Sequence, residues 1–213
     1  MFKKSFRAIL ISCVVLTFCL LAACGKNEQS SKVEKPEKPD KLPIATITVK
    51  DYGVIEAELY PHIAPNTVYN FISLANKGFY DGLNFHRIVK NFVIQGGDPL
   101  GTGAGGPGYS INGEFSSNGF ENNLKHTAGV LSMARANDPN SAGSQFFIMT
   151  NDTPSLDGQY ASFGKVIKGM DVVKKIEAVD VNAEEKPMTP VTIESIKVDT
   201  MGKKYPKPKT IKE

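Results

Sequence analysis

The chain has 213 residues, of which 41% are hydrophobic and 22% are charged, so it can bury one ordinary core and is too short for two. Its formal charge of +3 comes from 25 basic and 22 acidic residues, and three of the basic ones, Lys3, Lys4 and Arg7, lie at the N-terminus. Without these three the chain has 22 charges of each sign, which argues against binding to nucleic acid.

The N-terminus predicts a secretory signal peptide over residues 1–23. The three basic residues precede an apolar run of about fifteen residues, which as a helix would rise ~22 Å, less than the ~30 Å hydrocarbon core of a bilayer. The run ends in LAAC (21–24), which resembles the lipobox of bacterial lipoproteins and implies cleavage before Cys24 and a diacylglycerol on its sulfur. The alternative is ordinary signal cleavage beside an incidental cysteine.

Two appendages flank the expected folded domain, residues 44–198. Residues 24–43 mix Lys, Glu, Ser and Pro with almost no apolar side chains and predict a disordered tether, anchored to lipid through Cys24. Residues 199–213 carry five lysines and predict a basic flexible tail, with contact to anionic lipid as the alternative to a solvated one. Cleavage before Cys24 leaves no second cysteine, so no internal disulfide is expected.

The domain has mostly β signals. Apolar and polar residues alternate in ATITV (45–49) and VIEAEL (54–59), which predicts a β-hairpin. Apolar residues recur every three to four positions over 65–77 and 170–178, which predicts two helices, with Pro65 in the first turn of one. Strands are predicted at 85–89, 130–134, 145–149, 162–166 and 191–198. Many short strands with two helices favour a closed antiparallel barrel or a sandwich.

Three apparent motifs lack the context that their chemistry needs. GTGAGG (101–106) satisfies G-x-G-x-x-G, but no strand-helix-strand pattern surrounds it, so a flexible surface loop is expected in place of a nucleotide site. His62, His86 and His126 are far apart in sequence and predict hydrogen-bonded structural histidines, with no metal site. Ser144 has neither a G-x-S-x-G elbow nor persuasive triad partners.

Polar side chains on strand faces are the remaining signal. In QFFIMT (145–150), period-two geometry places Phe146 and Ile148 on one face and Gln145 and Phe147 on the other. In FHRIV (85–89) the same geometry places Phe85, Arg87 and Val89 together. An apolar patch that carries Arg87, Gln95 and Gln145 predicts a groove for a peptide, with pockets for side chains and donors for carbonyls.

Five stretches, in this order, resemble a cyclophilin, a member of a family of peptidyl-prolyl cis-trans isomerases. They are FHRIVKNFVIQGGD (85–98), GTGAGGPG (101–108), LKHTAGVLSMARA (124–136), GSQFFIMT (143–150) and SLDGQYASFGKV (155–166). The resemblance covers about residues 44–198. It implies a mainly β fold, a closed eight-stranded antiparallel β-barrel capped by two α-helices, with the active groove on the outer surface of the barrel.

Position by position, the resemblance implies that Arg87 is the catalytic residue. The implied pocket for the proline ring consists of Phe92, Val93, Phe147 and Leu156. The other implied substrate-binding residues are Gln95, Ala134, Arg135, Gln145 and Tyr160. Rotation about an Xaa-Pro bond makes and breaks no covalent bond, so no cofactor is expected.

Three positions depart from the family's pattern. Ser155 stands where many members have tryptophan, and this puts tight cyclosporin binding in doubt. Tyr160 stands where a histidine is common in the groove, and Arg135 where an asparagine often follows the SMA motif. The charge of Arg135 predicts a preference for acidic residues near the substrate proline.

The sequence as a whole predicts a monomeric, lipid-anchored isomerase of Xaa-Pro segments in unfolded or exported polypeptides. The predicted location is the extracytoplasmic face of a bacterial cell membrane, where such substrates emerge. One alternative is a proline-binding chaperone or docking module with incidental catalysis. A solute-binding lipoprotein is another.

Overall fold

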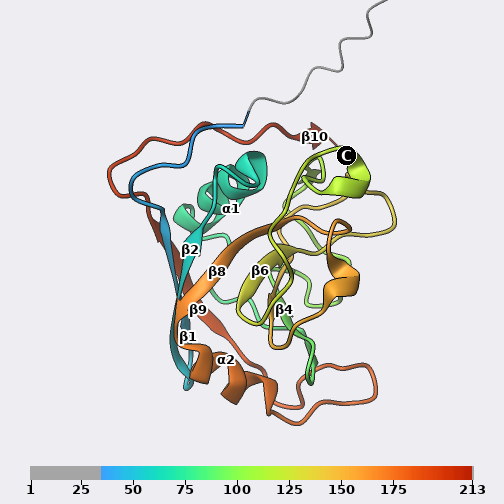
Figure 1. The fold of residues 1–213 in the computed structure, drawn as a ribbon. Coiled ribbons are helices and arrows are strands. Elements are labelled where there is room, and N and C mark those ends of the chain that lie inside the picture. The colour runs from blue at the N-terminus through green and yellow to red at the C-terminus, as the bar shows by residue number, and fades with distance from the viewer. Residues whose placement is uncertain (1–34, 213) are drawn as a thin grey trace, which may run out of the picture. The chain divides into compact units, whose positions relative to one another are not determined.

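The computed structural model describes residues 35–212, so the predicted signal peptide, Cys24 and the tether up to residue 34 lie outside the described residues. Between residues 35 and 212, eight strands form one antiparallel sheet in the order β3-β4-β7-β6-β8-β2-β1-β9. Two α-helices lie at opposite ends of this strongly curved sheet (Figure 1). Two further strands, β5 and β10, pair with each other apart from it.

The element bounds confirm both predicted helices and place a strand in each predicted strand segment. The strands of the large sheet are β1 (Ile44–Val49), β2 (Gly53–Leu59), β3 (Arg87–Val89), β4 (Val93–Gly96), β6 (Val130–Met133), β7 (Phe146–Met149), β8 (Ser162–Lys168) and β9 (Ile193–Asp199). The remaining elements are α1 (Pro65–Asn76), α2 (Met170–Glu177), β5 (Tyr109–Ser110), β10 (Ile211–Lys212) and two short 3₁₀ helices, Ser116–Asn118 and Pro154–Leu156.

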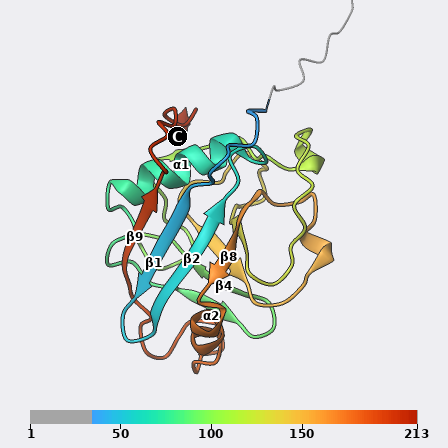
Figure 2. The ribbon, with the colours of Figure 1, turned by 60° about the vertical axis from the view of Figure 1, so that its left-hand side comes forward.

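In the predicted hairpin of β1 and β2, the apolar residues of the alternating pattern form part of the hydrophobic core. The register pairs Ala45 with Ala57 and Ile47 with Ile55, and all four of these side chains are buried. The polar residues between them point away from the core, as the period of two requires. Figure 2 shows β9, β1, β2 and β8 side by side, in agreement with the strand order.

An aromatic cluster fills the inside of the curved sheet. The ring of Phe71, from α1, lies 5.3 Å from the ring of Tyr80, 5.4 Å from that of Phe146 and 5.2 Å from that of Phe163. All four side chains are buried. The Phe71 and Phe146 rings meet edge to face, a geometry that adds to the free energy gained from burying their apolar area.

The sheet is curled, and the expectation of a closed eight-stranded barrel is met only in part. Its edge strands, β3 and β9, do not pair with each other as strands. The segments that precede them do meet: Asn84 forms an isolated bridge with Thr192, and the Phe85 N–H donates to the Val191 carbonyl at 2.9 Å. The structure therefore shows a mainly β, cyclophilin-like half-barrel with two helices.

Helix α1 obtains its N-terminal hydrogen bonds from a distant residue. Ala64, at its N-cap, has no side-chain acceptor, and the buried carboxylate of Glu114 accepts the N–H groups of Asn66 and Thr67 at 2.9 and 2.8 Å. Burial raises the pKa of Glu114, although these hydrogen bonds oppose the shift. From residue 35 to 212, no helix has the length and apolar character that crossing a membrane requires.

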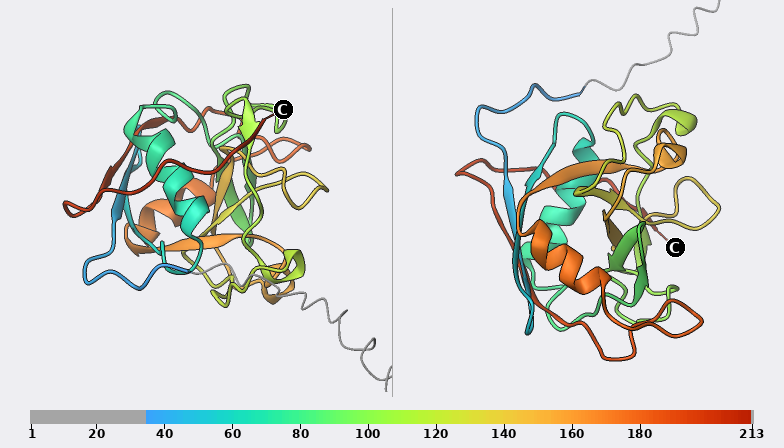
Figure 3. Two further views of the ribbon diagram at one scale, coloured as in Figure 1. Left: turned by 90° about the horizontal axis from the view of Figure 1, so that it is seen from above. Right: turned by 60° about the horizontal axis from the view of Figure 1, so that its bottom comes forward.

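The C-terminal segment differs from the predicted flexible tail. Ile211 pairs with Ser110 across β10 and β5, and the ring of Tyr205 lies 5.7 Å from the ring of Tyr69 in α1. The side chain of Asn66 exchanges two hydrogen bonds with the backbone of Lys209, at 2.7 and 3.0 Å. The left view of Figure 3 shows this segment lying across α1. These contacts were not predicted, because the high lysine content of the segment suggested a flexible tail.

Candidate active site

A second apolar cluster lies on the outer face of the sheet, separate from the main core. We call it the outer cluster. Its buried members are Val93, Val130, Phe147 and Met149, and its partly buried members are Val89, Phe92, Leu124, Ala134, Leu156 and Tyr160. It contains all four residues of the predicted proline pocket, Phe92, Val93, Phe147 and Leu156, together with Ala134 and Tyr160. The other members were not predicted as site residues.

Strand pairing sets a row of side chains across this outer face. Arg87 pairs with Gln95, Gln95 with Phe147, and Phe147 with Ser132. Directly paired residues point to the same face of a sheet, and neighbouring strands lie ~4.8 Å apart, so the guanidinium side chain starts only two strands from the apolar pocket. The prediction that Phe146 and Ile148 share one face and Phe147 lies on the other is confirmed, because the first two belong to the main core and Phe147 to the outer cluster.

The face predicted for Phe85 is wrong. Phe85 is fully buried in the main core, as is Ile88, while Arg87 and Val89 face outward. Strand β3 begins only at Arg87, and the two residues before it are not in strand conformation. Because the period of two holds only within a strand, it could not be extended back to Phe85.

The guanidinium of Arg87 is held from two sides. Its Nε donates to the Glu185 carboxylate at 2.7 Å, and its Nη1 donates to the Gln95 side-chain oxygen at 3.4 Å. Both charged side chains are partly exposed, 39% for Arg87 and 41% for Glu185. Glu185 was not predicted as a site residue, and it lies 98 positions away along the chain.

The two glutamines continue the polar row towards the glycine-rich loop. The amide of Gln95 donates to the side-chain oxygen of Gln145 at 3.0 Å. The amide of Gln145 in turn donates to the carbonyls of Gly103 and Gly105, each at 2.9 Å. Each amide thus has its oxygen towards Arg87 and its nitrogen towards the loop, which fixes the orientation of both side chains.

The glycine-rich loop, residues 98–108, is organised by the buried side chain of Asp98. Its carboxylate accepts the N–H groups of Leu100, Thr102 and Gly103 at 2.7, 2.9 and 2.5 Å. Burial alone would raise the pKa of Asp98, but these bonds, with a further one from Gly105, lower it below its usual value. A Cβ atom at Gly105 would collide with this carboxylate, which explains a glycine at that position.

Arg135 is engaged on all three of its guanidinium nitrogens. These donate to the backbone carbonyls of Gln159 (3.0 and 3.2 Å), Ala136 (2.8 Å) and Asn137 (3.2 Å). The guanidinium also lies over the Tyr160 ring, 4.7 Å from its centre, and over the Phe115 ring, at 5.1 Å. Arg135 therefore braces the loop that carries Tyr160, and does not project as a free charge.

The three histidines differ from one another. His126 stacks on the Phe147 ring at 6.2 Å and contacts Ser132 Oγ at 3.0 Å and Asp157 at 3.2 Å, as a hydrogen-bonded structural histidine should. Burial lowers its pKa, although Asp157 opposes the shift. By contrast, His62 Nδ1 and both ring nitrogens of His86 are buried without a partner among residues 35–212. The same residues contain no group of three or more potential metal ligands.

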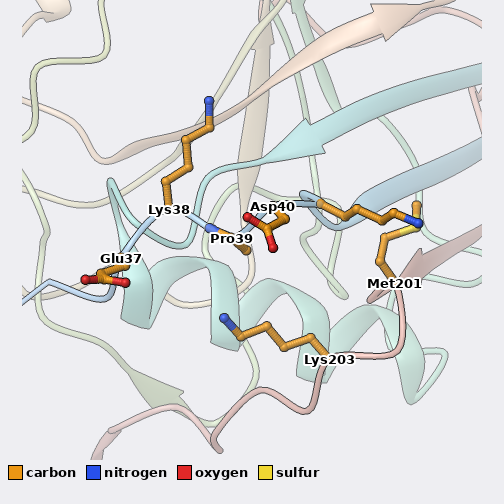
Figure 4. Close-up of a pocket in the computed structure, with 7 residues that line it drawn as sticks. Glu37, Lys38, Pro39, Asp40, Met201 and Lys203 are labelled. Atoms are coloured by element: carbon orange, nitrogen blue, oxygen red, sulfur yellow. The ribbon is translucent and has the colours of Figure 1, made fainter.

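Two of the hollows on the described surface are considered as ligand sites. One adjoins the outer cluster and the polar row, encloses about 640 Å³ and is lined by Gln95, Leu100, Gly103 to Tyr109, Ala134 to Ala136, Ser141, and Gly143 to Gln145. The other, shown in Figure 4, lies between the segments before β1 and after β9, encloses about 490 Å³ and is lined by Glu37 to Lys41, Met201 and Lys203. Its three lysines and two carboxylates offer no single sign of charge to a ligand. The first hollow is the candidate for substrate.

Ser155 lies in the 3₁₀ helix Pro154–Leu156 and is exposed. The neighbouring Leu156 reaches the outer cluster, so this helix supplies the pocket with one apolar side chain. The serine at this position leaves the rim of the pocket without a large ring.

Comparisons with known proteins agree with this arrangement. Residues 44–198 match the family model described as cyclophilin type peptidyl-prolyl cis-trans isomerase/CLD. Peptidyl-prolyl cis-trans isomerase-like 1 of Neurospora crassa is 50% identical over 147 residues, 68% of this chain and 88% of the relative. Peptidyl-prolyl cis-trans isomerase B of Bacillus subtilis is 50% identical over 136 residues, 64% of this chain and 92% of the relative.

A solved structure extends the comparison to the fold. The crystal structure of a Cryptosporidium parvum cyclophilin type peptidyl-prolyl cis-trans isomerase, in the presence of the dipeptide Ala-Pro, superposes with a TM-score of 0.67 at 36% identity. The similarity covers 73% of this chain and 98% of that one.

Proposed function

This chain belongs to the cyclophilin family and is a peptidyl-prolyl cis-trans isomerase, and we propose on that premise that it acts on exported polypeptides at the outer face of a cell membrane. In the proposed site, Arg87 is the catalytic residue and the outer cluster holds the proline ring. The observation that carries this assignment is the row Arg87–Gln95–Phe147 across three paired strands.

The chemistry requires an electrostatic catalyst. Rotation about an Xaa-Pro bond removes amide resonance, with a barrier of ~18–20 kcal/mol. In the twisted transition state the prolyl nitrogen regains a lone pair, and a fixed guanidinium donates a hydrogen bond to it that the planar ground state accepts poorly. Such a contact accelerates the rotation because it is stronger in the transition state than in the bound substrate.

The geometry leaves the inner edge of the Arg87 guanidinium available for this contact. Its Nε is taken by Glu185, while its Nη1 makes only a long contact of 3.4 Å with Gln95. The Phe147 ring, 5% exposed, forms an apolar floor two strands away. The polar groups of Gln95 and Gln145 are placed to align the substrate backbone, and the apolar floor favours the less dipolar, twisted amide.

Exchange NMR on an Xaa-Pro peptide tests the catalytic assignment. The full chain should accelerate cis-trans exchange, and Arg87→Ala should lower kcat/KM by roughly 100-fold, the usual cost of losing one fixed transition-state donor. Arg87→Lys keeps the charge without the planar fork and should restore only a small part of the activity. If Arg87→Ala remains folded and equally active, the assignment of Arg87 is wrong.

The proposed location is supported by the LAAC sequence at 21–24 and by the lysine-rich, apolar-poor segment that follows it. A lipid on Cys24 would hold the isomerase where unfolded substrates emerge and raise their effective concentration. Metabolic labelling with a radioactive fatty acid should mark the chain and fail to mark Cys24→Ser. An unlabelled, freely released parent protein would overturn the anchor and leave the isomerase assignment intact.

The Arg87→Ala variant also distinguishes the isomerase from the alternative, a proline-binding chaperone or docking module. Suppression of aggregation of an unfolded client that persists unchanged in Arg87→Ala, alongside low turnover in the parent, would favour binding as the main role. Loss of accelerated refolding in that variant would favour catalysis.

A further inference from the structure

Glu185, the ion-pair partner of Arg87, lies outside the sheet that carries Arg87 and Gln95. Glu185 lies in the loop between α2 and β9, 98 positions from Arg87, and its Oε2 accepts from Arg87 Nε at 2.7 Å. With exposed fractions of 39% and 41%, the two side chains lie where an ion pair adds little to folding stability. The reason for the pair is therefore to be sought in what it does to the guanidinium.

The loop that carries Glu185 is tied into a fixed shape. The side-chain oxygen of Asn182 accepts the N–H groups of Glu184 and Lys186, each at 3.0 Å. The backbone N–H of Asn182 donates to the Lys186 carbonyl at 2.9 Å, and the N–H of Glu185 donates back to the Asn182 carbonyl at 3.0 Å. A loop with four such bonds over five residues presents its side chains in a narrow range of positions.

Glu185 itself has a left-handed backbone. Its φ of +64° is a conformation that a residue with a Cβ atom adopts at a cost, and glycine would adopt it freely. The Glu185 carbonyl also accepts the Ile88 N–H at 2.8 Å, which fastens the loop to strand β3 beside Arg87. A carboxylate at a position where local conformation favours glycine indicates a use for that carboxylate.

We propose that Glu185 is a positioning residue for the isomerase reaction, which orients the Arg87 guanidinium towards the proline pocket. The carboxylate binds Nε on the outer side of β3, and Gln95 contacts Nη1 on the inner side. With Nε bound by Glu185 and Nη1 in long contact with Gln95, the arginine side chain has less rotamer freedom before substrate arrives, so less reorganisation is needed in the transition state. The inference rests on the proposed catalytic role of Arg87.

The test compares Glu185→Ala, Glu185→Gln and a matched control, Glu184→Ala, in the full chain. Glu184 lies in the same loop, is exposed, and contacts Asn182 only through its backbone. Alanine and glutamate have a similar cost at positive φ, so the variants keep the backbone strain constant. Exchange NMR gives kcat and KM for an Xaa-Pro peptide in each case.

We expect Glu185→Ala to lower kcat about tenfold, the loss expected for one charge-assisted hydrogen bond that acts in the transition state, with KM changed less than twofold. Glu185→Gln should recover most of the activity, because its amide oxygen still accepts from Nε. Glu184→Ala should match the parent. The Arg87 Nε–H signal in ¹H–¹⁵N spectra should be sharp in the parent and in Glu185→Gln, and broadened by exchange in Glu185→Ala.

The double variant Arg87→Ala/Glu185→Ala separates this inference from the assignment on which it rests. If Glu185 acts through Arg87, the double variant should be no less active than Arg87→Ala alone. A kcat of Glu185→Ala equal to that of Glu184→Ala, while Arg87→Ala is inactive, would overturn the positioning role alone. An active Arg87→Ala would overturn the catalytic assignment first.

Discussion

The two faces of strands β4, β6 and β7 are built from the same backbone but on different principles. The inner face presents Ile94, Leu131 and Phe146 to the main core, which is apolar and almost without exposed area. The outer face presents Gln95, Ser132 and Phe147, and its polar groups are hydrogen-bonded to side chains outside these strands, Gln145 and His126. The inner face thus supplies most of the stability of the fold, and the outer face can carry charge because stability depends less on it.

Neighbouring phenylalanines in β7 provide the sharpest test of this contrast. Phe146→Ala removes an inner ring that lies 5.4 Å from Phe71 and should cost about 3–5 kcal/mol of unfolding free energy. Phe147→Ala removes a ring from the outer cluster, whose neighbours are partly exposed, and should cost about 1–2 kcal/mol less, because solvent and side chains can fill the space. Urea unfolding measures both.

The same two variants should affect KM in the opposite order, with the larger change in Phe147→Ala. Phe147→Ala should raise KM for an Xaa-Pro peptide about tenfold, since a buried ring contact is worth one to two kcal/mol. Phe146→Ala, measured at low temperature where it is folded, should leave KM within a factor of about three. Equal stability losses and equal KM values in the two variants would show that the faces do not differ in role.

Substitution of Asp98 tests whether the site on the outer face depends on the glycine-rich loop. Asp98→Ala leaves the N–H groups of Leu100, Thr102 and Gly103 without their acceptor and should cost about 1–3 kcal/mol. Because Gln145 donates to the carbonyls of Gly103 and Gly105, kcat/KM should also fall, by about fivefold. Asp98→Asn keeps one acceptor oxygen and should show smaller losses. Amide chemical shifts unchanged over residues 100–108 in Asp98→Ala would contradict this.

The buried histidines predict a pH dependence of stability. Burial is the main cause that lowers the pKa values of His62, His86 and His126 below 6.5, so the unfolded chain binds protons that the folded chain does not. The unfolding free energy should therefore be constant above about pH 7 and fall as the pH drops through 6.5. The carboxylates with lowered pKa values, Asp98, Asp157 and Glu177, act only at lower pH.

Urea unfolding at pH 8, 6.5 and 5.5 measures this dependence. His126→Asn removes the proton-binding site beneath Phe147 and should flatten the curve without abolishing it, since His62 and His86 remain. A curve for His126→Asn identical to that of the parent would place the whole effect in the other two histidines. Stability that rises on acidification would contradict the assignment for all three.

Local patterns predicted the parts of the molecule that local forces build. The hairpin of β1 and β2 and the inward and outward faces of β7 follow from alternation within one strand, and α1 follows from its apolar period. The pocket residues could be located because motifs in one order along the chain resemble those of a known family.

Long-range contacts escaped the same reasoning. Nothing around Glu185 or Glu114 indicates their partners, because each acts on a group that only folding brings near. Phe85 was assigned to the wrong face because the strand begins two residues later than the pattern suggested. The C-terminal segment was taken for a tail because its composition is polar, while Tyr205 and Ile211 are sufficient to dock it.

The smallest effect is expected at Arg135. Here the sequence and the structure predict different substrate preferences. As a free charge it would favour acidic residues near the substrate proline, but its three nitrogens are bound to backbone carbonyls and its plane lies on Tyr160. Peptides with Glu or Lys beside the Xaa-Pro bond should therefore be turned over within about twofold of each other, since an engaged, solvent-screened charge discriminates weakly.

Arg135→Lys completes this test, because it keeps the charge and loses the planar fork that reaches the Gln159 carbonyl and covers the Tyr160 ring. If Arg135 acts as a brace, kcat/KM for both peptides should fall together, by about threefold, as the Tyr160 loop becomes less well fixed. If it acts as a charge, the lysine variant should keep parental turnover and the Glu-flanked peptide should be preferred in both proteins. A uniform loss would show that Arg135 serves the groove by holding the Tyr160 loop in place, and not by presenting a charge to the substrate.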